Sequence, residues 1–145
     1  MNTNDKSRIE TKEEVKAYIH RLKYAINNGA RMIFQQYRNV DNERQERFTN
    51  AYTVNALFPD ENPVEALKRE LLSLGEENYM KTVKDIKFPN KSEMREFGKT
   101  YNGTDDVYIK IRVELIDECG NPTTFVMSFH FAEKAFAPED FPYRK

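Results

Sequence analysis

Residues 106–131 have the sequence DVYIKIRVELIDECGNPTTFVMSFHF, in which apolar and polar side chains alternate on both sides of a glycine-asparagine pair. Alternation with period two, combined with many β-branched and aromatic residues, is typical of strands that are buried on one face. The pattern therefore predicts a β-hairpin with an apolar face against the core. The predicted core side chains are Val107, Ile109, Ile111, Val113, Leu115, Phe125, Met127, Phe129 and Phe131.

The opposite face of this hairpin is predicted to be mostly polar. It would carry Tyr108, Lys110, Arg112 and Glu114 from the first strand, and Thr124, Val126, Ser128 and His130 from the second. A two-residue loop at Gly120 and Asn121 would pair Arg112 with Phe129 and place a cation beside the core. We therefore expect a loop of about three to five residues that uses this glycine and asparagine.

The chain before residue 78 has mainly helical periodicity. Thr11 and Glu14 form a capping-box pattern ahead of an apolar stripe, and Gly29 stands where a left-handed C-terminal cap is favoured. Asn62 followed by Pro63 is the pattern of a helix cap and a first helical residue. The predicted helices cover residues 11–29, 42–57, with Asn42 as the cap, and 63–75, and a short strand is expected at residues 31–37.

From residue 78 onward the period changes from helical to two. Strands are predicted at residues 78–86 and 92–101, and the Asn102-Gly103 pair predicts a tight turn into the strand that begins at Asp106. Helices followed by a run of strands indicate an α+β fold, with N-terminal helices packed on an antiparallel β-meander. We expect residues 1–10 to be a disordered tail, residues 11–145 to form a single domain, and the arm after Ala132 to pack over the sheet.

The composition points away from several classes of protein. Hydrophobic residues make up 39% and charged residues 32% of the 145 residues, and no apolar run approaches the roughly 20 residues that cross a bilayer. The first ten residues lack the apolar segment of a secretory signal, so a cytoplasmic protein is expected. One cysteine, two histidines and five glycines cannot assemble the usual zinc and nucleotide signatures, so neither a metal nor a cofactor is expected.

Charge is unevenly distributed along the chain. The formal net charge of −1 gives no overall electrostatic case for nucleic-acid binding. Residues 78–112, however, contain eight lysines and arginines against five acids, whereas residues 41–77 contain four against nine. The positive part of the molecule is therefore expected on the sheet.

The polar face of the hairpin has the side chains for metal-independent RNA cleavage. Such cleavage needs a base for the 2′-hydroxyl, an acid for the leaving 5′-oxygen, and cations near the charge that develops on phosphorus. His130 titrates in the suitable range, and Tyr108, Lys110 and Arg112 are potential neighbours. Simple solvated surface is the alternative interpretation of such a face.

Four segments, in this order, resemble a known family of toxins. They are SLGEENYMKTV at residues 73–83, MREFGKTY at 94–101, DDVYIKIRV at 105–113 and FVMSFH at 125–130. Together they are similar to the toxin family named for the motility quorum-sensing regulator, which consists of RelE-like mRNA interferases. The resemblance covers roughly Leu72 to Phe131, and the helix at residues 11–29 resembles the first helix of that family more loosely.

The resemblance implies a RelE-like fold and a metal-independent endoribonuclease of a type II toxin–antitoxin module. RNA would be its substrate and a cognate antitoxin its protein partner. Lys81 matches the family's strand lysine, Tyr108 its functional tyrosine, and His130 stands where the family has a lysine in the last strand. The family's tryptophan-glutamine pair is replaced by Met94 and Arg95. The implied catalytic residues are Lys81, Tyr108 and His130, and the implied phosphate contacts are Arg95, Lys110 and Arg112.

Two other interpretations of the same face remain open. One is a catalytically silent protein-binding module of phage or mobile-element origin, which the near-neutral charge and the missing glutamine favour. The other is a stand-alone domain whose polar face has no specific role. The catalytic hypothesis makes a geometric prediction, namely that Tyr108 and His130 lie within reach of Lys81.

Overall fold

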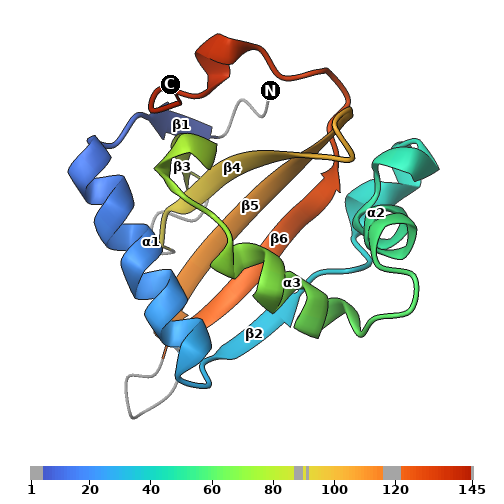
Figure 1. The fold of residues 1–145 in the computed structure, drawn as a ribbon, viewed down its shortest axis with the longest axis horizontal. Coiled ribbons are helices and arrows are strands. Elements are labelled where there is room, and N and C mark those ends of the chain that lie inside the picture. Colours follow the sequence, from blue (N-terminus) through green and yellow to red (C-terminus); the bar gives the residue numbers. More distant parts are fainter. Residues whose placement is uncertain (1–4, 87–89, 91, 116–121, 145) are drawn as a thin grey trace.

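The computed structural model describes residues 5–86, 90, 92–115 and 122–144. Its α+β architecture is a twisted six-stranded sheet with helices α1 and α3 lying across one face (Figure 1). The strands are β1 (Asp5–Arg8), β2 (Arg31–Phe34), β3 (Tyr79–Asp85), β4 (Met94–Tyr101), β5 (Asp105–Leu115) and β6 (Pro122–Phe131). The helices are α1 (Lys12–Asn27), α2 (Asn50–Leu57) and α3 (Pro63–Leu72). None of the helices in these ranges is long and apolar enough to cross a bilayer.

The predicted antiparallel meander forms the centre of the sheet. The strand order is β1-β3-β4-β5-β6-β2, and the four strands from β3 to β6 are antiparallel neighbours in chain order. Asn102 and Gly103 both have positive φ, at 53° and 78°, as a tight hairpin turn of the predicted kind requires. The hairpin between β4 and β5 is therefore confirmed.

The two edge strands differ from the predicted pattern. β2 pairs with β6 in parallel, so the sheet is not wholly antiparallel. β1 pairs with β3, so the prediction of a disordered tail is wrong for residues 5–10. The guanidinium of Arg8 holds this segment by donating to both carboxylate oxygens of Glu93, at 2.7 and 3.0 Å.

The register between β5 and β6 shifts once along their length. Ile109 lies opposite Phe129, but Ile111 lies opposite Val126, so β6 has one extra residue, Met127, at this point. An extra residue of this kind is a β-bulge, and it exchanges the two faces of the strand from that point on. The two halves of β6 therefore do not obey a single alternation.

The bulge overturns part of the predicted hairpin. Thr124 and Val126 are buried, and Val126 is part of the core, whereas Phe125 lies opposite Arg112 on the other face, with the guanidinium 5.2 Å from its ring centre. The predicted faces of residues 124–127 were therefore wrong, while those of residues 128–131 hold. The predicted loop at Gly120 and Asn121 lies outside the described residues.

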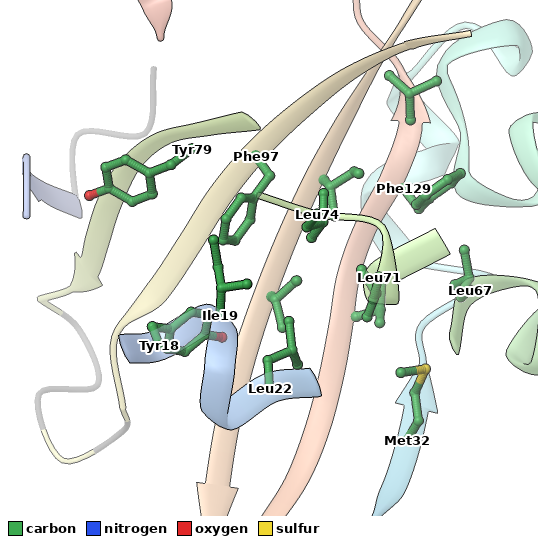
Figure 2. Close-up of a cluster of buried hydrophobic side chains, with 14 of the residues drawn as sticks. Tyr18, Ile19, Leu22, Met32, Leu67, Leu71, Leu74, Tyr79, Phe97 and Phe129 are labelled. Atoms are coloured by element: carbon green, nitrogen blue, oxygen red, sulfur yellow. The ribbon is translucent and has the colours of Figure 1, made fainter. Parts of the chain in front are cut away.

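The first and third helices form at the predicted places, although α3 ends at Leu72 and not at Gly75. The hydroxyl of Thr11 accepts from the amide of Glu14 at 3.2 Å, and the Glu14 carboxylate accepts from the amide of Thr11 at 3.0 Å, which completes the capping box. Asn62 caps α3 by accepting from the amide of Glu65 at 3.1 Å. The apolar stripes of both helices pack on the sheet, as Figure 2 shows. The labelled core side chains include Tyr18, Ile19, Leu22, Leu67, Leu71, Leu74, Phe97 and Phe129.

The helix predicted at residues 42–57 is shorter than expected. α2 begins only at Asn50 and is capped by Thr49, whose hydroxyl accepts from the amide of Tyr52 at 3.2 Å. Residues 39–48 form two short 3₁₀ turns instead. Half of these ten residues are charged, and they have no apolar stripe that packing could stabilise, so Asn42 is not a cap.

Asn50 fastens α2 to the bulged part of β6. Its buried amide nitrogen donates to the carbonyls of Gln35 and Met127, at 2.8 and 3.0 Å, and its oxygen accepts from the amide of Phe129 at 3.0 Å. The side chain of Asn50 thus provides hydrogen-bond partners for three backbone groups, two carbonyls and one amide, on β6 and on the segment before α2.

Replacing Asn50 by alanine is expected to lower the free energy of unfolding by roughly 3 kcal/mol, because buried backbone groups lose their partners. Urea denaturation measures the change. The matched control is Asn55→Ala on the exposed face of the same helix, which should stay within about 0.5 kcal/mol of the wild type. Equal effects of the two substitutions would contradict the anchoring role of Asn50.

The C-terminal arm packs over the sheet as predicted. Phe136 and Phe141 lie on Gly98 of β4, where a Cβ atom would approach their rings to 2.7 and 2.9 Å. The backbone amide of Phe136 donates to the carboxylate of Asp106 at 2.8 Å, and the hydroxyl of Tyr143 donates to the carbonyl of Glu10. The arm therefore links β4, the start of β5 and the segment after β1.

Candidate functional site

The side of the sheet opposite α1 and α3, called the rear face below, carries most of the predicted polar residues. Strand pairing places Lys81 opposite Glu96, Glu96 opposite Lys110, and Lys110 opposite Ser128, in one row across four strands. The next row contains Gly98, Tyr108 and His130. The rear face is thus formed by Lys81, Glu96, Gly98, Tyr108, Lys110, Arg112, Ser128 and His130.

Tyr108 and His130 form a direct cross-strand pair on this face. Their ring centres are 5.3 Å apart with the planes tilted by 38°. Both residues lie in the part of the β5–β6 pairing between the bulge and the start of β5, where apolar and polar side chains still alternate. The predicted proximity of these two side chains is therefore found in the structure.

The environment of His130 selects one protonation state. Burial, together with the charges of Arg44 and Arg38, lowers the pKa of His130 below its ordinary value, although a hydrogen bond to the Phe131 carbonyl acts in the opposite direction. Nδ1 lies 2.9 Å from that carbonyl, which can only accept, so Nδ1 carries the proton. The imidazole is then neutral at pH 7, and its Nε2 is an available base.

Two arginines that the sequence did not single out lie beside this pair. Nη1 of Arg38 donates to the hydroxyl of Ser128 at 3.1 Å, and Arg44 is close enough to lower the pKa of both Arg38 and His130. Burial is the main cause of the lowered pKa of Arg38, but a guanidinium keeps its proton at neutral pH. Two cations therefore stand together at the β6 side of the rear face.

The contacts of these arginines leave one guanidinium nitrogen, and one oxygen of the neighbouring Asp41, buried without a hydrogen-bond partner among the described residues. Asp41 accepts from the backbone amide of Arg38 at 3.0 Å, and Arg44 Nε lies 3.8 Å from the carboxylate of Glu133, whose side chain is 61% exposed. Among the described residues, the buried Nη1 of Arg44 has no hydrogen-bond partner. A buried guanidinium nitrogen without a partner is costly unless a ligand satisfies it.

The sequence missed Arg38 and Arg44 because of where they lie. Arg44 is in the acidic stretch of residues 41–77 and was assigned to a helix, and Arg38 follows a short strand with no motif around it. The hydrogen bonds of Asn50 to Gln35 and Met127 hold residues 35–49 against β6. This path of the chain brings Arg38 and Arg44 to that strand. The one local signal is Asp41, three residues after Arg38, whose side chain closes the turn that presents this arginine.

The predicted lysines and Arg112 are spread along the rear face. Lys110 is next to Tyr108 on the same face of β5, and Arg112 continues that face towards Phe125. Lys81 is three strands away from His130, which corresponds to about 14 Å of sheet at the usual strand spacing. Lys81 is therefore not beside the Tyr108–His130 pair, contrary to the geometric prediction.

Arg95 is on the other side of the sheet. It lies opposite Ile111, which belongs to the core, and its guanidinium is 4.5 Å from the ring centre of Tyr18 on α1. Its Nε donates to the buried carboxylate of Glu10 at 2.9 Å. Arg95 thus makes a structural ion pair and does not share a surface with Tyr108, so its assignment as a contact in the same site is corrected.

Comparison with protein-family models, curated proteins and solved structures finds no match to this chain. Within the described ranges, no three His, Cys, Asp or Glu side chains gather into a group that could hold a metal ion. The candidate site consists of the side chains of the rear face together with Arg38 and Arg44.

Proposed function

We propose that the β6 side of the rear face binds the RNA backbone and cleaves it without a metal ion, as a toxin-like endoribonuclease. The observation that carries this proposal is the placement of two guanidiniums, one with a buried unpartnered nitrogen, beside a neutral histidine. Arginine forks match the oxygens of a phosphate, and a neutral imidazole can accept the proton of the 2′-hydroxyl.

The proposed reaction uses groups within this cluster. Nε2 of His130 takes the 2′-hydroxyl proton, the 2′-oxygen attacks phosphorus, and the bond from phosphorus to the 5′-oxygen breaks. Arg38 and Arg44 stabilise the negative charge that develops on the phosphorane. The hydroxyl of Tyr108 is the candidate proton donor to the 5′-oxygen. The products are a 2′,3′-cyclic phosphate and a 5′-hydroxyl.

The other predicted residues take different places in this proposal. Lys110 and Arg112 lie on the same face and are suited to neighbouring phosphates. Lys81, at about 14 Å of sheet from β6, can contact only a more distant part of the RNA. Arg95 has no role in RNA binding, because it faces the helices.

The resemblance of residues 72–131 to RelE-like mRNA interferases supports the same proposal. It would place the chain in a type II toxin–antitoxin module, with a cognate antitoxin as the protein partner. We expect the antitoxin to bind over the rear face, because a protein bound there would directly block the access of RNA.

Two observations favour the second candidate, a catalytically silent module that binds a protein. His130 is only 7% exposed, and the C-terminal arm covers Gly98 in the same row of the sheet. Both features limit the access of a nucleotide to the imidazole. In this alternative the same face holds a protein partner and RNA is not cleaved.

A cleavage assay in EDTA separates the two candidates. Purified protein is incubated with a labelled single-stranded RNA, and the ends of the products are analysed. We expect cleavage in EDTA, because the proposed catalytic groups are all side chains of the protein. The products should have 2′,3′-cyclic phosphate ends, because the 2′-oxygen is the attacking group. RNA that stays intact with the wild-type protein would contradict the enzymatic proposal and favour the binding module.

A further inference from the structure

A pocket of about 400 Å³ lies between α1 and the sheet, on the face opposite the proposed RNA site. Its lining comes from one side of α1 and from β4, β5 and β6. The lining residues used in the argument below are Tyr18, Arg21, Ala25, Arg95 and Val113. The volume is within the range of pockets that enclose small organic molecules.

The pocket combines mostly apolar walls with a buried hydroxyl group. Figure 2 shows Tyr18 on α1, directed towards the sheet and next to Ile19 and Leu22. Tyr18 is 4% exposed, and its hydroxyl has no hydrogen-bond partner among the described residues. A tyrosine hydroxyl buried in this way normally has a partner, so its position favours a ligand that supplies one.

Two guanidiniums give the pocket its charge. Arg95 lies over the ring of Tyr18 and is largely neutralised by Glu10, but its Nη1 makes only one long hydrogen bond, of 3.5 Å, to the carbonyl of Glu93. Arg21, on the exposed side of α1, adds a second cation to the lining. The pocket therefore has an excess of about one positive charge.

We propose that this pocket binds a small monocarboxylate with an apolar body. The carboxylate would accept from the hydroxyl of Tyr18 and from Arg95 and Arg21, and the apolar body would lie against Ala25 and Val113. Glu10 neutralises one of the two guanidiniums, so a ligand with a single negative charge matches the one positive charge that remains. A planar carboxylate also matches the fork of a guanidinium. A multiply charged phosphate fits less well, because most of the lining is apolar.

Octanoate is the probe for this proposal, and octanol is its uncharged counterpart. Calorimetric titration of the intact protein should show saturable binding of one octanoate per chain, together with a raised melting temperature. Octanol should bind about tenfold more weakly, because it lacks the charged group that the guanidiniums recognise. No saturable octanoate binding, or equal binding of both compounds, would overturn the proposal.

Two variants locate the ligand. Ala25→Phe fills the pocket and should abolish octanoate binding. Tyr18→Phe should weaken octanoate binding about tenfold while the melting temperature of the ligand-free protein stays the same or rises, because an unpaired buried hydroxyl is removed. Tyr24→Phe, at a 66% exposed position of the same helix, is the matched control and should change neither quantity. Unchanged octanoate affinity in Ala25→Phe would place the ligand elsewhere and contradict the assignment.

Discussion

Replacing His130 by glutamine is expected to slow RNA cleavage by about 10²–10⁴-fold, which is the usual contribution of a positioned general base. Glutamine keeps a similar size and polarity but cannot take up a proton at neutral pH. The measurement is the single-turnover cleavage rate of a labelled RNA in EDTA. The other histidine, His20, is exposed on α1, and His20→Gln is the matched control with an unchanged rate.

The arginines provide an independent part of the same test. Arg44→Gln removes the guanidinium with the unpartnered nitrogen and should slow cleavage by about 10²–10³-fold, as the loss of one charge-stabilising donor does. Arg31→Gln, at an exposed position of β2, is the control for a general loss of positive charge. A rate that falls equally in both arginine variants would indicate nonspecific electrostatics and contradict the assigned role of Arg44.

Replacing Glu10 by alanine is expected to lower the free energy of unfolding by roughly 3 kcal/mol, because it leaves the charge of Arg95 without its buried partner. Thr82 also loses the carboxylate to which its hydroxyl donates. Urea denaturation measures the loss. In the double variant Glu10→Ala, Arg95→Met part of the stability should return, since no unpaired charge remains. A loss below about 1 kcal/mol in the single variant would contradict the importance of this ion pair.

The same carboxylate predicts a dependence of stability on pH. Burial raises the pKa of Glu10, but hydrogen bonds from Arg95 and Thr82 outweigh it, so the pKa is lowered from its ordinary value of 4.5. A carboxylate with a lowered pKa in the folded state stabilises the protein above pH 4.5, and this stability is lost as the pH falls through the folded-state value. Glu10→Ala should therefore show a flatter loss of stability below pH 4.5 than the wild type.

Local patterns in the sequence predicted the elements that depend on local interactions. The capping box at Thr11, the Asn62-Pro63 start of α3 and the Asn102-Gly103 turn each require only a few neighbouring residues, and all three form as predicted. The Tyr108–His130 pair was also predictable, because both residues lie in the part of the hairpin that keeps its alternation.

The remaining features depend on contacts between distant parts of the chain. The bulge at Met127 has no sequence signature, and it is anchored by Asn50, 77 residues earlier. Arg38 reaches Ser128 across 90 positions of sequence, so no local motif identifies it as part of the site. Arg95 lies on the core face, where a cation is tolerated mainly because the buried carboxylate of Glu10, 85 positions earlier, pairs with it.

The contact of the C-terminal arm with β4 also has a consequence for the evolution of this chain. Because Phe136 and Phe141 occupy the space that any side chain at position 98 would need, glycine at that position and the two aromatic residues form a coupled set. A homologue that lacks the arm is free to carry a larger residue at position 98, whereas one that keeps both aromatics should keep the glycine. Covariation of these three positions would therefore show which relatives share the closed rear face and which leave it open.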